Sequence, residues 1–228
     1  EQVRAAYAEQ IAALAEGGVD LFAVETMMFP QEATAAIRAC KAVTDLPVMA
    51  TMFFQFEELH DRDRTMWGET PGEVAKNLLA AGADVVGMNC GRGPDRAIVI
   101  IREMRAVTDA PLVAYPNAGL PDERGQYGET PASLAFKLKR FAQEGWVNIV
   151  GGCCGTTPAH IQALAGLVRG YPPRRPAPQE PQAVSGIEVL YPTDDNRPIF
   201  VGERTNVIGS RRFKELIVGG QFEEAAEI

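Results

Sequence analysis

Histidine is scarce in this sequence, with only two among 228 residues. Hydrolytic zinc centres usually combine histidine with carboxylate ligands, so the sequence contains few candidate ligands for such a centre. His60 lies in a charged segment, EELHDRDR, and His160 follows the proline of a helix start, TTPAHIQAL. We therefore interpret both histidines as surface or capping residues, which argues against a histidine-based hydrolase.

Long apolar runs and an excess of positive charge are also missing. Glycine, proline or charged residues interrupt every apolar stretch within about ten residues, short of the ~18 that a membrane-spanning helix requires. Acidic side chains outnumber basic ones by 30 to 22, which gives a net charge of −8. This balance argues against nucleic acid or an anionic membrane as a partner.

The chain does not begin with methionine, and its first residues, EQVRAAYAEQIAALAEGG, predict an amphipathic helix rather than a signal peptide. Four cysteines without a signal peptide predict a reducing, cytoplasmic compartment, where thiol or metal chemistry is more usual than disulfides. The missing initiator methionine indicates a fragment or a processed chain.

The sequence repeats itself at a constant spacing. Three segments are alike: GGVDLFAVET (17–26), AGADVVGMNC (81–90) and EGWVNIVGGC (144–153). Asp20, Asp84 and Asn148 occupy equivalent places in them, 64 residues apart each time. A second pair, AVTDLPVMA (42–50) and AVTDAPLVA (106–114), has the same spacing. Each apolar run fits a buried parallel strand.

The elements alternate between strand and helix, which predicts an α/β fold with a parallel sheet. Five strands are expected at about 19–25, 47–54, 84–89, 111–116 and 147–152. The tetrapeptide GETP at 68–71 and 128–131 supplies a threonine cap followed by proline, as at a helix start.

The repeat length distinguishes two architectures. Two βα units per 64 residues would place eight units in roughly 250 residues, the usual size of a (β/α)8 TIM-type barrel. We therefore predict an incomplete barrel, about its last five βα units, with about three units expected upstream. The alternative is an open, doubly wound sheet of five strands, but no glycine-rich phosphate loop follows any predicted strand.

The character of the chain changes after residue 170. Residues 1–170 form the predicted barrel domain, and the proline-rich residues 171–196 are expected to form an extended linker. Residues 197–228 contain an apolar run and a helical pattern, the expected first strand and helix of a second barrel.

Three cysteines follow predicted strands of the repeat: Cys90, Cys153 and Cys154. The carboxyl ends of parallel strands are where α/β proteins build their sites, so three thiolates would meet at one rim and hold zinc with its fourth position open. The alternative is three small buried residues that pack a strand end. A thiol substrate that completes such a site is deprotonated, which suits attack on an alkyl group.

Two further polar residues end predicted strands. Glu25 ends the first strand and could bind a substrate ammonium group, or else be a solvated or arginine-paired carboxylate. Asn117, in YPNAGLP (115–121), could bind substrate or the zinc ion when substrate is absent, or else be a turn residue before Gly119. The charged segment 56–70 is expected to cover the site or to contact another module.

The motifs at these positions resemble the homocysteine S-methyltransferase family. They are VETM (24–27), MNCGRGP (88–94), YPNAGLP (115–121) and GGCCGTTP (151–158). A later segment, FVGERTNVIGSRRF (200–213), resembles the opening of the pterin-binding barrel of the cobalamin-dependent methionine synthases. Together the two resemblances cover nearly the whole chain.

The resemblance implies a reaction and a set of roles. Cys90, Cys153 and Cys154 would bind zinc, Glu25 would contact the amino group of L-homocysteine, and Asn117 would be a zinc ligand in the substrate-free site. The methyl group would come from methylcobalamin, recharged by 5-methyltetrahydrofolate, on cobalamin- and folate-binding modules of the same parent chain. Glu203 and Asn206 would belong to the folate pocket.

Three other interpretations remain. A cobalamin-independent homocysteine S-methyltransferase would take its methyl group from betaine or S-methylmethionine, and a homocysteine module could be fused to a folate reductase. The segment 200–213 argues against both. A non-catalytic zinc-binding or scaffolding domain is the third, and it would bind zinc without responding to homocysteine.

Overall fold

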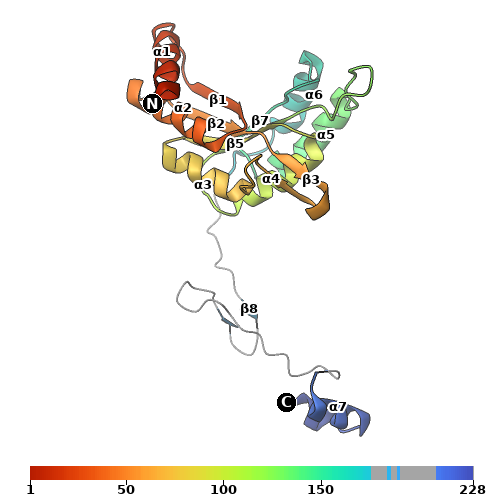
Figure 1. Ribbon diagram of the computed structural model, residues 1–228. Coiled ribbons are helices and arrows are strands. Elements are labelled where there is room, and N and C mark those ends of the chain that lie inside the picture. The colour runs from red at the N-terminus through yellow and green to blue at the C-terminus, as the bar shows by residue number, and fades with distance from the viewer. Residues whose placement is uncertain (176–183, 186–188, 191–208, 228) are drawn as a thin grey trace. The chain divides into compact units, whose positions relative to one another are not determined.

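A computed structural model describes residues 1–175, 184–185, 189–190 and 209–227 (Figure 1). The chain divides into two compact units, residues 1–178 and 179–228. Each unit is described by itself below. Among the described helices, none combines the length and the apolar character needed to cross a bilayer.

The first unit is built on a sheet of five parallel strands. They are β1 (Phe22–Met27), β2 (Val48–Met52), β5 (Val85–Cys90), β6 (Leu112–Pro116) and β7 (Ile149–Val150). All five coincide with the predicted strands, which confirms the α/β fold. The strands lie in the sheet in chain order, β1-β2-β5-β6-β7. A doubly wound sheet reverses its order at a switch point, so this order is that of a barrel segment, although the described strands do not close one.

Helices lie between the strands and cover one side of the sheet. They are α1 (Gln2–Glu16), α2 (Pro30–Val43), α3 (Pro71–Ala81), α4 (Pro94–Arg105), α5 (Pro131–Gln143) and α6 (Pro158–Val168). Each helix packs against the next along the chain, and Figure 1 shows them as an arc around the sheet. Thr70 and Thr130 cap α3 and α5 with complete capping boxes, which confirms the helix starts predicted from the GETP motifs.

The 64-residue repeat has a structural cause at the amino-terminal end of the sheet. Asp84 Oδ2 accepts a hydrogen bond from the backbone N–H of Val48, the first residue of β2, at 2.7 Å. One repeat later, Asn148 Oδ1 accepts from the backbone N–H of Leu112, the first residue of β6, at 3.2 Å. The repeated polar residue therefore ties the start of a neighbouring strand, which fixes the register between units.

The two faces of the sheet differ in polarity at the carboxyl end of the strands. On β1, Phe22 and Val24 are buried in the core beneath the helices, while the alternate residues Ala23 and Glu25 are exposed. The same alternation places Thr51 and Tyr115 on the inner face. A group of polar side chains therefore collects inside the arc, where a closed barrel would have its mouth.

The first half of the charged segment 56–70 was predicted to be a loop, and this prediction is wrong. It forms an antiparallel hairpin of β3 (Gln55–Glu57) and β4 (Arg62–Arg64), joined by the 3-10 turn η1 (Glu58–His60). Contacts with α4 hold the hairpin in place, and no alternation of apolar and polar residues in its own short strands predicts it. Asp63 is 1% exposed and forms an ion pair with Arg96, whose guanidinium lies over the Phe56 ring at 4.0 Å.

The chain continues to pack on the first unit beyond residue 170, where the linker was predicted to begin. The side chain of Arg174 is buried and donates hydrogen bonds to the backbone carbonyls of Thr108 and Ala110. The carbonyl of Arg174 accepts from Asn148 Nδ2 at 3.4 Å. These bonds attach the start of the proline-rich segment to the amino-terminal side of β6.

The second unit contains β8 (Val184–Ser185) antiparallel to β9 (Val189–Leu190), followed by α7 (Arg211–Val218) and α8 (Phe222–Ala226). Ser210 caps α7, accepting from the backbone N–H of Phe213 at 3.3 Å, so the helix predicted in this region is present. The predicted strand before it, with Glu203 and Asn206, lies outside the described residues.

Candidate metal centre

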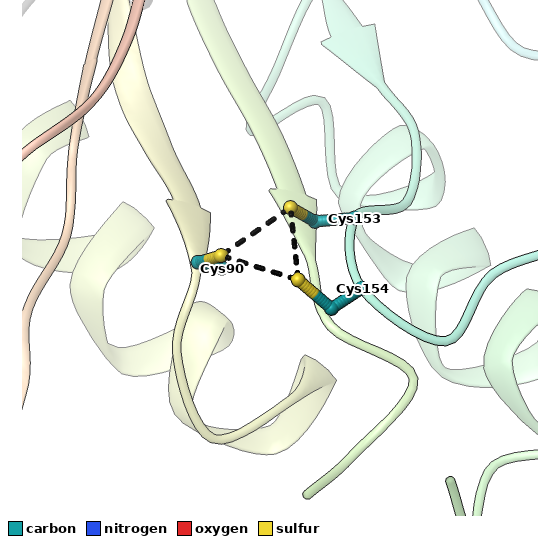
Figure 2. A group of neighbouring side chains, drawn as sticks. All are labelled: Cys90, Cys153 and Cys154. Carbon is teal, nitrogen blue, oxygen red and sulfur yellow. Dashed lines mark hydrogen bonds between the residues drawn. The ribbon is translucent and has the colours of Figure 1, made fainter. Parts of the chain in front are cut away.

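The sulfurs of Cys90, Cys153 and Cys154 lie close together at the carboxyl end of the sheet (Figure 2). Cys90 is the last residue of β5, and the other two follow β7. The Sγ atoms of Cys90 and Cys153 are 3.4 Å apart, those of Cys90 and Cys154 are 3.7 Å apart, and those of Cys153 and Cys154 are 3.9 Å apart. The predicted convergence of the three sulfurs is therefore present.

These separations fit a tetrahedral metal ion with sulfur ligands. Zn–S bonds of about 2.3 Å at tetrahedral angles place the sulfurs about 3.8 Å apart. The observed separations of 3.4–3.9 Å lie around that value. Three soft thiolate donors favour zinc over calcium or magnesium, which prefer oxygen. The donor set and its spacing thus suit a zinc ion with one position left for a further ligand.

The local backbone explains how adjacent cysteines turn toward the same point. Cys90 has a left-handed backbone with φ of 64°, which redirects its side chain at the end of the strand. Gly152 is required because a Cβ there would lie 2.3 Å from a methyl carbon of Thr156. Gly155 has a φ of 81°, and a Cβ there would lie 2.2 Å from Cγ of Tyr127. The glycines of this turn are therefore required for specific steric reasons.

The Cys90 thiol resists ionisation in the absence of a cation. Burial, together with the neighbouring sulfurs of Cys153 and Cys154, raises the pKa of the Cys90 thiol to about 12. Three thiolates at these distances repel one another, so their deprotonation is favourable only when a positive charge is bound between them. The cluster therefore couples proton release to metal binding.

Asn117 joins the two loops that carry the cysteines. Its Nδ2 donates to the carbonyl of Gly91 at 2.9 Å, and its Oδ1 accepts from the backbone N–H of Cys154 at 3.0 Å. The side chain is buried, and both ends of its amide are used. The amide thus aligns Cys90 and Cys154, and its role as a metal ligand in the substrate-free site stays a prediction.

Glu25 lies at the carboxyl end of β1 with its carboxylate exposed. The hydroxyl of Tyr115 donates to Glu25 Oε2 at 3.1 Å. Burial raises the pKa of Tyr115, and the charge of Glu25 raises it further, so the phenol stays protonated as a donor. Within the described part of the chain, no arginine or lysine forms an ion pair with Glu25. The carboxylate is therefore oriented yet available for a cation.

A series of polar contacts connects Glu25 with the cysteine cluster. The Tyr115 hydroxyl is 3.0 Å from Thr51 Oγ1, which donates to Asn89 Oδ1 at 2.8 Å. Asn89 Nδ2 is 3.8 Å from the sulfur of Cys153. Sequence reasoning missed Thr51, Asn89 and Tyr115. The only available signal was that each is a polar residue at the end of an otherwise apolar strand.

A pocket of about 280 Å³ opens beside Cys90. Phenylalanines 53, 54 and 56 give it an apolar wall, and Arg92 and Asn117 contribute polar groups. Phe56 belongs to the hairpin that α4 holds in place, and Arg92 forms an ion pair with Glu58 of the same hairpin. The hairpin is therefore one wall of the pocket. Whether segment 56–70 covers the site or contacts another module stays a prediction.

Neither histidine belongs to the group of candidate metal ligands, Cys90, Cys153 and Cys154. His160 is the N3 residue of α6, where its Nδ1 accepts from the backbone N–H of Thr157 at 3.1 Å. Its Nε2 consequently carries the proton and donates to the carbonyl of Glu129 at 3.0 Å. His60 is exposed and lies 3.5 Å from Glu57. Both have the capping or surface roles predicted for them.

Comparison with known proteins identifies relatives of the first unit. The family model described as homocysteine S-methyltransferase matches residues 1–168. The apo structure of the homocysteine methyltransferase MmuM from Escherichia coli has 24% sequence identity and a TM-score of 0.58, over 73% of this chain and 56% of that one.

Two further structures of the same enzyme are similar to the chain. The metallated form has 25% identity and a TM-score of 0.52, over 70% of this chain and 51% of that one. The oxidized form has 26% identity and the same TM-score of 0.52, over 70% of this chain and 52% of that one. The chain thus spans about half the length of these solved chains.

Proposed function

Because the chain belongs to the homocysteine S-methyltransferase family, we propose that it carries the thiol-activating centre of an enzyme that methylates L-homocysteine to methionine. The observation that carries the proposal is the cluster of three sulfurs, spaced 3.4–3.9 Å apart at the carboxyl end of the sheet. In the reaction, the substrate thiol loses its proton, its sulfur forms a bond to the methyl carbon, and the bond between that carbon and the donor breaks.

Cys90, Cys153 and Cys154 would hold zinc, which would supply the positive charge that keeps the substrate sulfur deprotonated at neutral pH. The similarity to a structure named as the metallated form of a homocysteine methyltransferase supports a metal here. The free state of all four cysteines suits a reducing, cytoplasmic compartment. Asn117 holds the two cysteine loops at the separation that the ligands require.

Glu25 binds the ammonium group of homocysteine. Its carboxylate is exposed on the inner face and is oriented by Tyr115. Charge-assisted hydrogen bonds of this kind are about twice as strong as neutral ones and are directional. When its ammonium group is bound at Glu25, homocysteine is oriented so that its sulfur, at the other end of the molecule, reaches the cysteine cluster.

The methyl donor is methylcobalamin, recharged by 5-methyltetrahydrofolate on further modules of the parent chain. The proposal rests on the resemblance of residues 200–213 to the opening of a pterin-binding barrel. Glu203 and Asn206 would contact the folate there, and residues 197–228 would begin that second barrel after the linker at 171–196. A betaine or S-methylmethionine donor, or a fused folate reductase, would leave this segment without its role.

The test is metal analysis of the 228-residue chain, followed by zinc K-edge absorption with and without L-homocysteine. We expect one zinc per chain with three sulfur ligands, rising to four when homocysteine is added. The Cys153→Ser variant should bind zinc at least about 100-fold more weakly, because even residues outside the ligand set change metal affinity by roughly 10- to 100-fold.

Cys40→Ala is the matched control, since Cys40 is buried in α2. It should keep the zinc content of the parent chain. Zinc without an additional sulfur on adding homocysteine would favour the non-catalytic, scaffolding interpretation. A folded chain without zinc would remove the basis of the proposed mechanism.

A further inference from the structure

Asn89 is a buried polar residue that is not among the cysteines or the substrate contacts described above. It is 1% exposed, and it immediately precedes Cys90 on β5. Its side chain nevertheless reaches across to β1. Oδ1 accepts from the backbone N–H of Thr26 at 2.9 Å, and Nδ2 donates to Thr26 Oγ1 at 2.6 Å. Both ends of the amide therefore hold one residue of another strand.

Thr26 occupies an unfavourable backbone conformation. Its φ of 57° lies in the left-handed region, which branched side chains rarely adopt. The pairing of β1 with β2 also shifts here, because Val24 pairs with Ala50 while Met27 pairs with Met52. Three steps on β1 thus match two on β2, so β1 carries one extra residue, a bulge. The bulge would leave the N–H of Thr26 without a strand partner if Asn89 did not accept from it.

The direction of Glu25 depends on this bulge. Glu25 immediately precedes Thr26, and both lie between the two paired positions where the register shifts. Bulges re-aim side chains near functional sites, and strained backbone persists there only where its surroundings hold it. Asn89 supplies that support from the strand that carries Cys90.

The orientation of the Asn89 amide is determined by its partners. A backbone N–H can only donate, so the atom that faces the N–H of Thr26 must be the oxygen. Thr51 Oγ1 donates to the same oxygen at 2.8 Å. The nitrogen therefore faces Thr26 Oγ1 and the sulfur of Cys153. An aspartate in this place would keep both bonds to the oxygen, but it would lose the donor and place a negative charge beside the sulfur of Cys153.

We propose that Asn89 is a positioning residue that fixes the bulge at Thr26, directs the Glu25 carboxylate, and thereby sets the preference of the site for thiols that carry an ammonium group. The inference rests on the proposed function, because it requires Glu25 to bind that group. Asn89 itself touches neither the substrate nor the metal in this arrangement.

The experiment compares two ligands by titration calorimetry on the zinc-loaded 228-residue chain: L-homocysteine, and 4-sulfanylbutanoate, which lacks the amino group. Asn89→Ala should weaken homocysteine binding by about tenfold or more, as expected for loss of a charge-assisted contact. Binding of 4-sulfanylbutanoate should weaken by less than that of homocysteine, because this ligand experiences only the lost contact of Asn89 with the Cys153 sulfur and has no ammonium group for Glu25. Glu25→Gln should produce the same selective loss.

Three further variants sharpen the comparison. Asn89→Asp keeps the acceptor for Thr26 and should restore the preference for homocysteine. Thr51→Val removes one donor to Asn89 and the contact with the Tyr115 hydroxyl but leaves the Thr26 contact, so it should reduce the preference less than Asn89→Ala does. Asn89→Ser keeps a polar group that is too short to reach Thr26, and it serves in place of Asn89→Ala if that variant does not fold.

The outcomes separate this inference from the proposed function. If Glu25→Gln reduces the preference and the Asn89 variants do not, the positioning role of Asn89 is wrong and the substrate assignment stands. If Glu25→Gln has no effect, the ammonium site is wrong and the inference fails with it. Equal weakening of both ligands, together with loss of zinc, would show that Asn89 has a general structural role and would overturn the proposal.

Discussion

At the scale of single residues, two of the three non-glycine residues with positive φ in the described part of the chain lie at the site. Thr26 and Cys90 are equivalent in the 64-residue repeat, and both have positive φ at the end of a strand. Such conformations are costly for residues with side chains and persist where several contacts over-determine them. Here those contacts include the bonds of Asn89 to Thr26 and the bond from the Asn117 backbone N–H to the Cys90 carbonyl. The strained backbone therefore recurs at equivalent positions of the repeat, at the carboxyl end of the sheet where the sulfurs meet.

At the amino-terminal end of the strands, an ion pair and a hydrogen bond of Asp84 contribute to stability, and this contribution can be tested. Lys41 Nζ donates to Asp84 Oδ2 at 2.7 Å, and the N–H of Val48 also donates to it. These bonds hold the pKa of Asp84 in the folded chain below its usual 3.8. The carboxylate thus contributes stability above pH 3.8, and this contribution is lost as the pH falls through the lower folded-state pKa.

Asp84→Asn should therefore lower the free energy of unfolding at pH 7 more than at pH 3. The variant keeps an acceptor for Val48, as Asn148 does naturally for Leu112, but it cannot pair with the charge of Lys41. Urea unfolding followed by circular dichroism at both pH values measures the difference between the two chains. A difference that does not change with pH would contradict this account of Asp84.

At the scale of secondary structure elements, the sequence predicted correctly those strands and helices that a repeated pattern marks. The five strands and the helix starts at Thr70 and Thr130 follow from the 64-residue spacing and the GETP motifs. The hairpin at 55–64 was not predictable, because its strands have three residues each and depend on Asp63 and Arg96, which are distant in sequence. The bulge in β1 was missed for the same reason.

The candidate site was predictable only in its cysteines. Their positions at strand ends carried the information, since parallel strands bring such positions together. Asn89, Thr51 and Tyr115 contribute through hydrogen bonds between strands, and these depend on the sheet's register and on which face each residue occupies. Neither the register nor the face of a residue can be read from the composition of a single strand. The assignment of Glu25 and Asn117 as substrate or metal contacts remains a prediction.

The pairing of β5 with β6 gives a test at this scale. A Cβ at Gly87 would lie 1.8 Å from the backbone carbonyl oxygen of Val113 on β6, so the strands would have to separate. Gly87→Ala should destabilise the chain by more than about 2 kcal/mol, as mutations that disrupt packed backbone do. Urea unfolding provides the measurement.

Gly166→Ala is the matched control for that substitution. Gly166 lies in α6, it is exposed, and nothing lies within 4 Å of the added carbon. Alanine there should stabilise the chain by about 0.5–1 kcal/mol, because glycine is the poorer helix former. Similar effects of the two substitutions would show that the close approach of β5 and β6 does not constrain residue 87.

At the scale of the whole molecule, the described sheet has two ends, β1 and β7, and a concave inner face. The candidate site lies on that face and uses residues from β1, β2, β5 and β6 and from the loop after β7. The chain spans about half the length of the solved relatives, with 56% of the MmuM chain covered. All residues assigned to zinc and homocysteine nevertheless belong to the first unit, within residues 1–178.

A chain shortened to residues 1–178 should therefore keep its zinc. The cysteine cluster, Asn117 and the Glu25–Tyr115 pair all lie in this unit, and Arg174 completes its packing with bonds to the carbonyls of Thr108 and Ala110. Competition with a chelator should give the same zinc affinity for the shortened and the 228-residue chains, within about twofold, because no ligand is lost. A chain ending at residue 170 is the comparison, since it lacks Arg174 and should unfold at lower urea. Weaker zinc binding by the 1–178 chain, with its fold intact by circular dichroism, would show that residues 179–228 contribute to the centre and that the two units do not function separately.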